Sequence, residues 1–436
     1  MRLFRMSGVH VPHRKNTAGN APVRMPPPAS VLIPLSMGIG APSTPTVQPG
    51  DRVLVGQKIA EAGGFVGAAI FSSVSGTVKK TETYRDVFGR VVSALVIDSD
   101  GEMTPDPSLA PVAVSTAKEL SDAARACGLV GLGGAGFPTA VKLAADPAKV
   151  DYILLNGAEC EPYITSDTRT MLDKTDELVA GMKLLRDLYS AAVVVGIERN
   201  KPEAIKKIRA EIAGESGLSV KVLPGSYPQG GEKVLIFNCT GRIVGEGKLP
   251  LDVGCIVLNV STTVELMKFL ATGMPLVERC LTVDGSAVAH PQNVIVPIGT
   301  RMRDVFDFCG GFQSEPGKIL YGGPMMGIAV PDAGFPVMKT TNAIVALNER
   351  DAILPDPTPC IRCGKCANTC PLHLTPFAIG EAVNKKDAET LGKLKVTLCM
   401  ECGCCSFICP AHRPLVQQNK LGKAILKAAM PPKGGK

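Results

Sequence analysis

The sequence contains no tryptophan, and aromatic residues make up only 4% of its 436 residues. Proteins that bind nucleic acids commonly combine aromatic stacking with basic grooves, and neither pattern recurs along this chain. No apolar run approaches the roughly 20 residues that a membrane-spanning helix needs. The N-terminus also lacks the apolar block of a signal peptide. These absences argue against nucleic-acid binding and against a transmembrane segment, and we expect a cytoplasmic chain.

Acidic residues are missing from the stretch AHRPLVQQNKLGKAILKAAMPPKGGK at the C-terminal end, which carries six basic residues. Because the formal net charge of the whole chain is +7, the remainder is nearly neutral. A basic tail of this kind can dock on an acidic partner or on the anionic face of a membrane. A plain solvated tail is the other interpretation of the same residues.

A disulfide framework is not expected in a reducing cytoplasm, so the 15 cysteines need another explanation. Nine of them fall between Cys360 and Cys409, and this clustering indicates metal binding. The scattered ones are expected to act mainly as small buried hydrophobic residues; they are Cys127, Cys160, Cys239, Cys255, Cys280 and Cys309.

The clustered cysteines form two copies of C-x2-C-x2-C-x3-C-P, in CIRCGKCANTCP and CMECGCCSFICP. This is the bacterial ferredoxin run, and two copies predict two 4Fe–4S clusters. In such pairs the fourth cysteine of each run ligates the other cluster. The expected ligand sets are Cys360, Cys363, Cys366 and Cys409 for one cluster, and Cys399, Cys402, Cys405 and Cys370 for its partner.

Two zinc sites are the alternative use of these cysteines, but two complete ferredoxin runs favour clusters. Cys404 falls outside the repeated pattern and is expected to be a bystander. His373 follows the first run closely, and loop surface is its expected role rather than ligation.

Short segments with a strand-like pattern, separated by glycines, extend from Ser30 to about Ser99. The pieces GDRVLVGQKI and SGTV resemble the biotinyl/lipoyl-type barrel-sandwich fold. Carrier domains of that fold hold a lysine on the hairpin between these pieces, and here that hairpin, EAGGFVGAAI, has none. The module is therefore expected to be structural. Residues 1 to about 30 are rich in proline, arginine and histidine and are expected to run as extended chain over the surface.

Helical patterns alternate with apolar β-runs in the middle of the chain. Thr116 and Glu119 form a capping box that begins a helix, Gly128 ends that helix, and Pro138 begins another. The runs VDYILLN and AAVVVGI predict buried strands, so this region is expected to be an α/β layer with a mostly parallel sheet. Residues 276–312 change to short β-runs with one short helix and resemble a β-grasp module of the SLBB type.

The stretch GLVGLGGAGFPTAV contains G-x-G-x-x-G at Gly131, Gly133 and Gly136. A Rossmann fingerprint needs a strand before this pattern and a helix directly after it. Here the preceding segment is helical and Phe137-Pro138 intervene, so the Rossmann interpretation fails. Three later segments, NGAECEP, YPQGGEK and NVSTT, are also loops beside predicted elements of the α/β layer. Together with the glycine loop they could converge on one pocket at the carboxyl edge of the sheet.

These four segments resemble, in the same order, motifs of the FMN- and NADH-binding subunits of respiratory complex I. The N-terminal GVHVPHRKNTAG, the barrel segment and the tandem cysteine runs resemble the C-subunit family of Rnf electron-transport complexes more closely, over nearly the whole chain. The resemblance implies a noncovalent FMN held by the glycine loop, with NADH stacked above it. Carried over by position, the residues that would hold the phosphate and ribityl chain of FMN are Gly131, Gly133, Gly134 and Lys142. Those that would line the rest of the flavin site are Asn156, Glu159, Gly230, Glu232, Asn259 and Thr262.

Two departures from the complex I pattern stand out. Leu132 replaces the arginine of the glycine motif, and Gly230-Gly231-Glu232 replaces a glycine followed by two glutamates. This chain therefore lacks the side chains that would make the corresponding contacts in complex I. Glu159 and Glu161 are the candidate catalytic residues, because a carboxylate at the carboxyl end of a strand could orient nicotinamide or water. Each is alternatively a surface carboxylate or a partner of Arg169.

The sequence thus predicts a multidomain α/β protein with four parts. They are an N-terminal extended segment plus barrel-sandwich hybrid (1–105), a Rossmann-like FMN/NADH domain (106–272), an SLBB β-grasp module (273–348), and an α-helical two-cluster ferredoxin domain with a basic tail (349–436).

The resemblance implies a reversible NADH-oxidising subunit on the cytoplasmic face of the cell membrane. It would pass electrons to membrane and iron–sulfur subunits of an ion-translocating Rnf-type complex, and indirectly to ferredoxin. A soluble flavin and iron–sulfur cobalamin reductase is one alternative. A non-catalytic electron-relay adaptor is the other.

Overall fold

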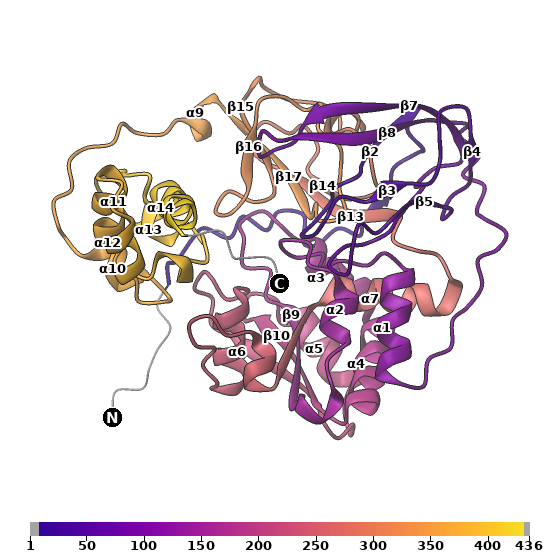
Figure 1. The fold of residues 1–436 in the computed structure, drawn as a ribbon, viewed down its shortest axis with the longest axis horizontal. Coiled ribbons are helices and arrows are strands. Elements are labelled where there is room, and N and C mark those ends of the chain that lie inside the picture. The colour runs from indigo at the N-terminus through magenta and orange to yellow at the C-terminus, as the bar shows by residue number, and fades with distance from the viewer. Residues whose placement is uncertain (1–7, 431–436) are drawn as a thin grey trace.

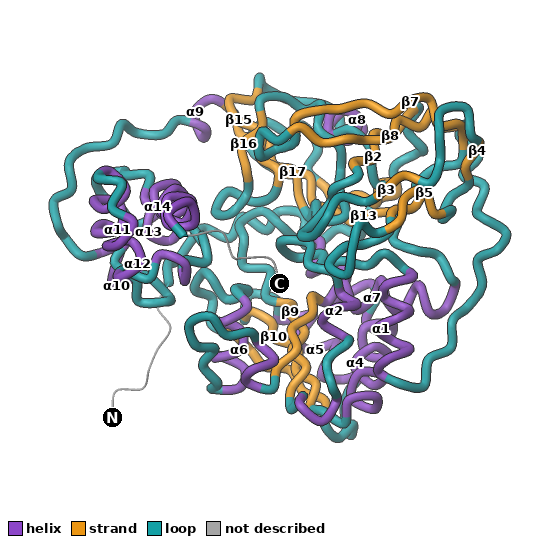
Figure 2. The backbone as a smooth tube through the Cα atoms, viewed as in Figure 1, coloured by secondary structure: helices purple, strands orange, loops and turns teal. Residues whose placement is uncertain are grey.

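The structure is a computed structural model that describes residues 8–430. Figure 1 shows the helical C-terminal region, in gold and yellow, set to one side of a larger body. In Figure 2 the larger body divides into an upper part made mostly of strands and a lower part in which helices flank a sheet that contains β9 and β10. The α/β, barrel-sandwich, β-grasp and helical parts predicted from the sequence are all present.

The barrel-sandwich module consists of two small antiparallel sheets, β2-β8-β7-β4 and β3-β5-β6. The β8 strand has a continuous buried centre from Ala94 to Ile97, which packs into the module's core because both of its faces are covered. The strands are β2 (Ser30–Pro34), β3 (Thr44–Pro45), β4 (Arg52–Val53), β5 (Lys58–Glu61), β6 (Ile70–Phe71), β7 (Gly76–Arg85) and β8 (Val91–Ser99).

The α/β domain contains a four-stranded, fully parallel sheet in the order β11-β10-β9-β12. Helices α1, α4, α5 and α7 contribute to the core on one face of this sheet, and α6 covers the other. The elements are α1 (Ala117–Ala126), α2 (Thr139–Leu143), β9 (Tyr152–Gly157), α3 (Ser166–Asp173), α4 (Thr175–Tyr189), β10 (Ala192–Glu198), α5 (Pro202–Glu211), β11 (Leu218–Leu223), α6 (Glu232–Thr240), β12 (Cys255–Asn259) and α7 (Val260–Thr272).

Three sequence predictions about this domain are confirmed. Thr116 and Glu119 form the capping box of α1, Pro138 is the N-cap of α2, and a helix rather than a strand precedes the glycine loop. The chain adds β10 and β11 on one side of β9 and then returns to add β12 on the other side. The order of the strands therefore reverses between β9 and β12, and this is the position where open α/β sheets bind ligands.

The β-grasp module is built on a six-stranded mixed sheet, in the order β1-β14-β13-β17-β15-β16. Its first strand comes from the N-terminal part of the chain and pairs in parallel with β14. The elements are β1 (Val23–Arg24), β13 (Glu278–Asp284), β14 (Gln292–Pro297), α8 (Met302–Phe308), β15 (Pro316–Tyr321), β16 (Ile328–Val330), β17 (Ala343–Asn348) and α9 (Glu349–Ala352).

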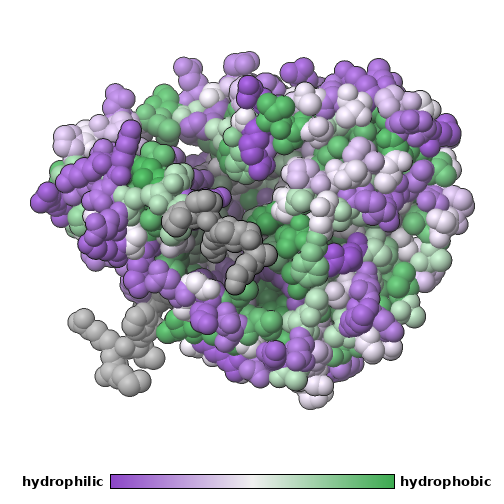
Figure 3. Space-filling model, viewed as in Figure 1, coloured by the Kyte–Doolittle hydropathy of each residue, from purple (hydrophilic) through white to green (hydrophobic). Residues whose placement is uncertain are grey.

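The C-terminal region is helical and is joined to α9 by a long exposed loop (Figure 1). Its small core gathers around Ile379, Leu391 and Val396. The helices are α10 (Lys365–Thr369), α11 (Pro376–Asn384), α12 (Ala388–Lys393), α13 (Cys404–Phe407) and α14 (Leu415–Ala429). The space-filling view in Figure 3 shows the surface hollowed between this region and the larger body, with apolar side chains, in green, along the side of the larger body.

Residues 8–18, which we call the N-terminal strap, differ from the sequence prediction. The prediction of an extended chain over the surface is wrong in part, because Val9, Val11 and Thr17 are buried. Val9 forms two backbone hydrogen bonds with Tyr227, so the backbone polar groups of this buried residue are satisfied. Figure 1 shows the indigo strap passing between the C-terminal helical region and the rest of the molecule.

Within residues 8–430, no helix is both long and apolar enough to cross a membrane. The basic tail predicted from the sequence is only partly included in these residues, since Lys433 and Lys436 lie outside them. Inside them, Lys420 and Lys423 on α14 both form ion pairs with Glu401. Part of the tail's positive charge is therefore neutralised locally.

Candidate functional site

Four loops meet at the carboxyl edge of the parallel sheet. Asn156, at the end of β9, donates a hydrogen bond from its side chain to the Gly230 carbonyl oxygen at 2.9 Å. Asn259 is the last residue of β12 and caps α7 by accepting from the Thr262 amide. The Thr262 hydroxyl in turn accepts from the Leu132 amide of the glycine loop at 3.0 Å. The structure thus brings the glycine loop, the β9 loop, the segment before α6 and the start of α7 to one place.

The glycine loop is a tight reversal closed by a hydrogen bond from the Gly131 amide to the Phe137 carbonyl oxygen. Two of its glycines are required by close packing. A Cβ on Gly133 would lie 2.6 Å from the side-chain nitrogen of Asn259, and Gly136 has a φ of +69° with the Gly38 Cα 2.8 Å from its Cβ position. These contacts fix the loop against α7 on one side and against the barrel-sandwich module on the other.

The outer part of the glycine loop suits a phosphate group. Gly133, Gly134 and Ala135 are exposed, and within the described residues their backbone amides donate to no acceptor of the chain. A Cβ on Gly134 would meet no atom within 4 Å. Successive free amides on a tight loop can form an anion-binding nest, which is what the phosphate of FMN needs. On this test the residues fit the flavin that the sequence implies.

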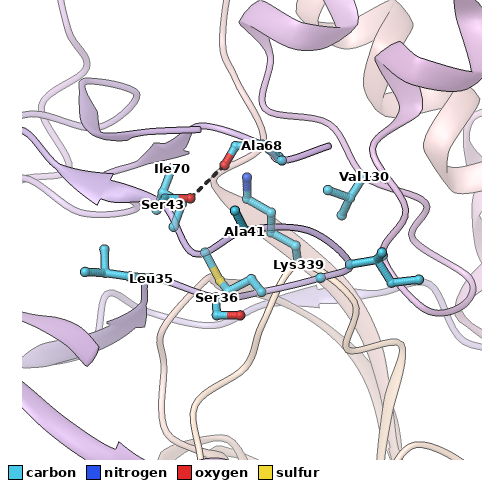
Figure 4. A pocket seen from close by; sticks show the side chains of 13 residues that line it. Leu35, Ser36, Ala41, Ser43, Ala68, Ile70, Val130 and Lys339 are labelled. Carbon is cyan, nitrogen blue, oxygen red and sulfur yellow. Dashed lines mark hydrogen bonds between the residues drawn. The ribbon is translucent and has the colours of Figure 1, made fainter. Parts of the chain in front are cut away.

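A small cavity lies behind the same loop, where Gly136 and Val130 meet the barrel-sandwich module. Figure 4 shows Lys339 reaching into it among Leu35, Ser43 and Ile70. The Lys339 ammonium group donates to the carbonyl oxygens of Ala69 and Gly128, and burial lowers the pKa of Lys339 to about 8. The cavity offers about 20 Å³, enough for one water molecule but far too small for a flavin.

Lys142 and Glu232 are brought together, although not on the glycine loop itself. The Lys142 ammonium group lies 3.0 Å from a carboxylate oxygen of Glu232 and 2.9 Å from the Val257 carbonyl oxygen. Lys142 is thus held at the end of α2, against β12 and the first residue of α6. The pair is partly exposed, so its Coulomb energy is small and its main effect is to place a positive charge at the sheet edge.

The Glu159 carboxylate points to the N-terminus of α3 rather than into an open site. It accepts from the Asp167 amide at 2.6 Å and from both the amide and the hydroxyl of Thr168. Burial raises the pKa of Glu159, while Lys15 and Lys201 oppose that rise. Asp167, which the sequence analysis missed, then accepts hydrogen bonds from Asn259 and Ser261. Glu159 therefore acts through Asp167 on Asn259, and this makes it a positioning residue in the structure.

Glu161 is also engaged by backbone groups. Its carboxylate accepts from the amides of Met325 and Met326, at 3.0 and 2.7 Å, in the loop between β15 and β16. Burial raises the pKa of Glu161 to about 7. Neither Glu159 nor Glu161 pairs with Arg169, which instead binds Asp173. Glu161 ties the β9 loop of the α/β domain to the β-grasp module.

The raised pKa of Glu161 predicts a pH-dependent stability. Between about pH 4.5 and about pH 7 the folded protein holds a proton that the unfolded chain has released, so the free energy of unfolding falls as pH rises through this window. We expect the titration of Glu161 to lower the free energy of unfolding by about 2 kcal/mol across this window, after allowance for the partial exposure of its side chain. Urea unfolding of the wild type and of Glu161→Gln at about pH 5.5 and about pH 8 measures it. The variant should lose less stability with rising pH, and equal losses would contradict the assignment.

Two lysines hold the backbone of the same β9 loop. The Lys15 ammonium group, from the N-terminal strap, donates to the carbonyl oxygens of Glu159, Glu161 and Ile164 at 2.8, 2.8 and 2.5 Å. Lys201 donates to Ala158 and also to Glu159. Burial lowers the pKa of Lys15 to about 8. Charged hydrogen bonds to three carbonyls fix a loop in which Glu159 has a φ of +43°, a conformation that is uncommon for a non-glycine residue.

The eight cysteines of the two ferredoxin runs line two separate cavities. The cavity that we call the inner cavity is lined by Cys370, Cys399, Cys402 and Cys405, together with Cys404 and apolar residues. The outer cavity is lined by Cys360, Cys363, Cys366 and Cys409. This division coincides with the two ligand sets expected from the fourth-cysteine exchange of ferredoxin runs.

The surroundings of the sulfurs suit iron–sulfur clusters. The Arg362 amide donates to the Cys360 sulfur, and the Asn419 side chain donates to the Cys399 sulfur, both at 3.4 Å. Hydrogen bonds to the sulfurs and limited solvent access are the levers that set cluster potentials. Within residues 8–430, no three His, Cys, Asp or Glu side chains gather closely enough to hold a single metal ion. A four-iron cluster makes no such demand, because each iron takes one cysteine sulfur.

The inner cavity abuts the loops at the carboxyl edge of the parallel sheet. Cys402 and Cys404 pack in one apolar cluster with Tyr227, Cys160 and the strap residue Val9. The Cys404 thiol lies 3.7 Å from the Tyr227 carbonyl oxygen. A Cβ on Gly231 would lie 1.9 Å from the Met400 methyl group, so the chain before α6 touches the second cysteine run directly. Cys404 is buried at this contact, whereas His373 is exposed on its loop.

The outer cavity lies near the surface. Cys363 is exposed, and the side chain of the neighbouring Ile361 is 69% exposed. The inner cavity therefore lies beside the loops at the carboxyl edge of the parallel sheet, whereas the outer cavity includes an exposed cysteine.

Comparison with protein-family models gives four matches along the chain. They are the RnfC barrel sandwich hybrid domain over residues 4–102, the Nuo51 FMN-binding domain over 124–268, the SLBB domain over 281–329, and the 4Fe-4S dicluster domain over 352–414.

Among curated proteins, the chain is 43% identical over 380 residues to the C subunit of the Na(+)-translocating ferredoxin:NAD(+) oxidoreductase complex of Acetobacterium woodii, covering 86% of each chain. It is 43% identical over 383 residues to the C subunit of the proton-translocating complex of Clostridium ljungdahlii, covering 86% of this chain and 83% of that protein. It is 40% identical to the C subunit of the ion-translocating oxidoreductase complex of Pseudomonas aeruginosa, covering 86% of this chain and half of that longer protein.

Among solved structures, a chain of an NAD+-reducing [NiFe]-hydrogenase in its H2-reduced state aligns with a TM-score of 0.49 at 19% identity. The alignment covers 73% of this chain and 63%, less than two thirds, of that one.

Proposed function

We propose that this chain is the subunit that exchanges electrons with NAD(H). The reason is that it belongs to the C-subunit family of ion-translocating ferredoxin:NAD(+) oxidoreductase complexes. Its substrate is NADH, its cofactors are FMN and two 4Fe–4S clusters, and its electron partners are other subunits of the complex. Flavin, when bound, takes up a hydride and releases electrons singly, and the clusters carry single electrons.

One observation carries this proposal. The inner cysteine cavity packs directly on Tyr227 and Gly231, which belong to the same loops that surround the glycine nest. The proposed binding places for flavin and for one cluster are thus neighbours within one chain. The outer cavity, with exposed Cys363, is the one that a partner protein can approach.

The chain's own residues have distinct roles in this proposal. The amides of Gly133, Gly134 and Ala135 bind the FMN phosphate, while Lys142 supplies positive charge at the sheet edge. Asn156 and Asn259 hold the β9 and β12 loops in register, with Thr262 supporting the glycine loop. The two glutamates position these loops from behind, and the backbone around Gly230 and Glu232 forms the remaining wall of the flavin site.

The proposed location is the cytoplasmic face of the membrane, as a peripheral subunit. Its relatives are named as subunits of ion-translocating complexes, which require membrane-embedded partners. The basic face of α14 around Lys427 would meet either an acidic partner protein or anionic lipid headgroups, in keeping with its surplus of positive charge.

Anaerobic addition of NADH to the reconstituted chain tests the function. We expect about one FMN per chain, and we expect the visible absorbance of that flavin to fall as NADH is added. An artificial one-electron acceptor should then restore the absorbance and support continuous NADH oxidation. A chain that binds FMN and clusters, but whose flavin NADH does not reduce, would instead be an electron-relay adaptor.

A further inference from the structure

An arginine of the β-grasp module is buried against the glycine loop. Arg279 lies on β13, and its side chain is only 4% exposed. Its guanidinium group donates to the Leu132 carbonyl oxygen at 3.4 Å and to the Thr341 carbonyl oxygen at 3.2 Å. A side chain 147 residues further along the chain therefore closes the glycine loop from its buried side.

The positive charge of Arg279 is not balanced by a neighbouring acid. Within residues 8–430, no carboxylate forms an ion pair with its guanidinium group. Burial lowers the pKa of Arg279, and the acids that oppose this most strongly are Glu265 and Asp167. Glu265 lies 3.9 Å from Lys268, and Asp167 accepts from the Asn259 side chain. Because a buried charge without a partner is costly, this place has a surplus of positive charge that an anionic ligand would offset.

Arg279 is connected with the exposed face of the glycine loop through one peptide unit. The Leu132 carbonyl oxygen, which Arg279 binds, belongs to the same peptide unit as the Gly133 amide. That peptide bond is trans, so its C=O and N–H point in opposite directions. The Gly133 N–H is therefore directed away from Arg279, and Gly133 itself is exposed. The Leu132 amide is held as well, by the Thr262 hydroxyl, so the base of the loop is fixed in one orientation.

We propose that Arg279 is a positioning residue for the phosphate-binding nest at Gly133–Ala135. It aims the Gly133 amide outward, and its charge polarises the shared peptide unit, so that this amide donates more strongly to an anion. The inference rests on the proposed function, and it makes the β-grasp module part of the flavin site. Because the nest is proposed to bind phosphate rather than the flavin ring, Arg279 should act on the phosphate group alone.

The test compares FMN with riboflavin, which has the same ring and ribityl chain but no phosphate. Binding to the flavin-free full-length chain, with its clusters reconstituted, is measured by quenching of flavin fluorescence. Arg279→Met should raise the Kd for FMN about tenfold, the loss expected when a charged hydrogen bond no longer supports the nest. The Kd for riboflavin should not change. The melting temperature of the flavin-free chain should change little, because the lost hydrogen bonds are offset by removal of a buried unpaired charge.

Two further variants separate the charge from simple packing. Arg279→Lys keeps a positive charge on a long side chain and should bind FMN more tightly than Arg279→Met does. Arg301→Met is the matched control, because Arg301 also donates from the β-grasp module to a backbone carbonyl, but to that of Gly334 rather than to the glycine loop. This control should leave both Kd values unchanged.

Three outcomes would overturn the role of Arg279 alone. They are an unchanged Kd for FMN in Arg279→Met, an equal rise in the Kd for both flavins, and equal Kd values for FMN in Arg279→Lys and Arg279→Met. A wild-type chain that binds neither flavin would overturn the proposed function itself, and the role of Arg279 with it.

Discussion

Replacing Cys402 with serine should lower the iron content of the reconstituted protein from about eight to about four atoms per chain. Cys402 is buried in the inner cavity, where it faces Cys370, Cys399 and Cys405. A serine hydroxyl does not supply the soft thiolate that iron–sulfur clusters select. Electron delivery to an external acceptor protein should fall by at least tenfold, because only one of two relay positions remains filled. Iron and acid-labile sulfide analysis, with NADH-dependent reduction of the acceptor, gives both results.

The same loop provides the control for this experiment. Cys404 is two residues away and also buried, but its thiol lies near the Tyr227 carbonyl oxygen. Cys404→Ser should therefore retain about eight iron atoms. Equal iron loss in the two variants would show that the ligand assignment is wrong. If the wild type contained zinc and no acid-labile sulfide, the assignment of iron–sulfur clusters would be wrong.

Replacing Gly134 with valine should abolish FMN binding while leaving the protein folded. A Cβ at this position meets no atom of the chain within 4 Å, so the added side chain occupies only the space in front of the nest. The melting temperature of the flavin-free protein should stay the same, and NADH oxidation should fall at least a hundredfold, since the whole activity depends on the flavin. Flavin content by absorbance and thermal unfolding of the flavin-free chains separate the two effects.

Gly19→Val is the matched substitution, because Gly19 is exposed and its Cβ position is equally open. That variant should bind FMN normally. If Gly134→Val also retains FMN, the nest at Gly133–Ala135 is not the phosphate site. A large loss of thermal stability in Gly134→Val would contradict the open geometry of the loop.

The sequence allowed most of the architecture to be predicted, because the signals were local. Alternation of apolar strands with capped helices predicts the parallel sheet, and Pro138 and the Thr116 capping box mark helix starts that the structure confirms. The cysteine spacing predicts two groups of four, and the same two groups line the two cavities. Resemblance to known families then supplied the flavin, which spacing alone could not identify.

The directions in which the Glu159 and Glu161 side chains point could not be predicted from the sequence. Glu159 and Glu161 stand at the carboxyl end of β9, as expected, yet their carboxylates bind backbone amides of α3 and of the loop near Met325. Those partners are supplied by segments far along the chain or by a helix terminus, and no spacing rule reports such contacts. Lys15 was missed for the same reason, since its three acceptors lie about 145 residues away. The SDT segment after the β9 loop did carry a signal for Asp167, because an acidic residue in the first turn of a helix, here α3, is a common helix-start feature.

The N-terminal strap has a consequence for how the protein is made. Its Val9 pairs with Tyr227, and the Thr17 carbonyl oxygen accepts from the Asn293 side chain. The strap therefore cannot reach its final place until the much later segments that receive it have been synthesised. Contacts of such long sequence separation form late, because the intervening loop must close first. We therefore expect the β9 loop that Lys15 fastens to be among the last parts of the sheet edge to become rigid.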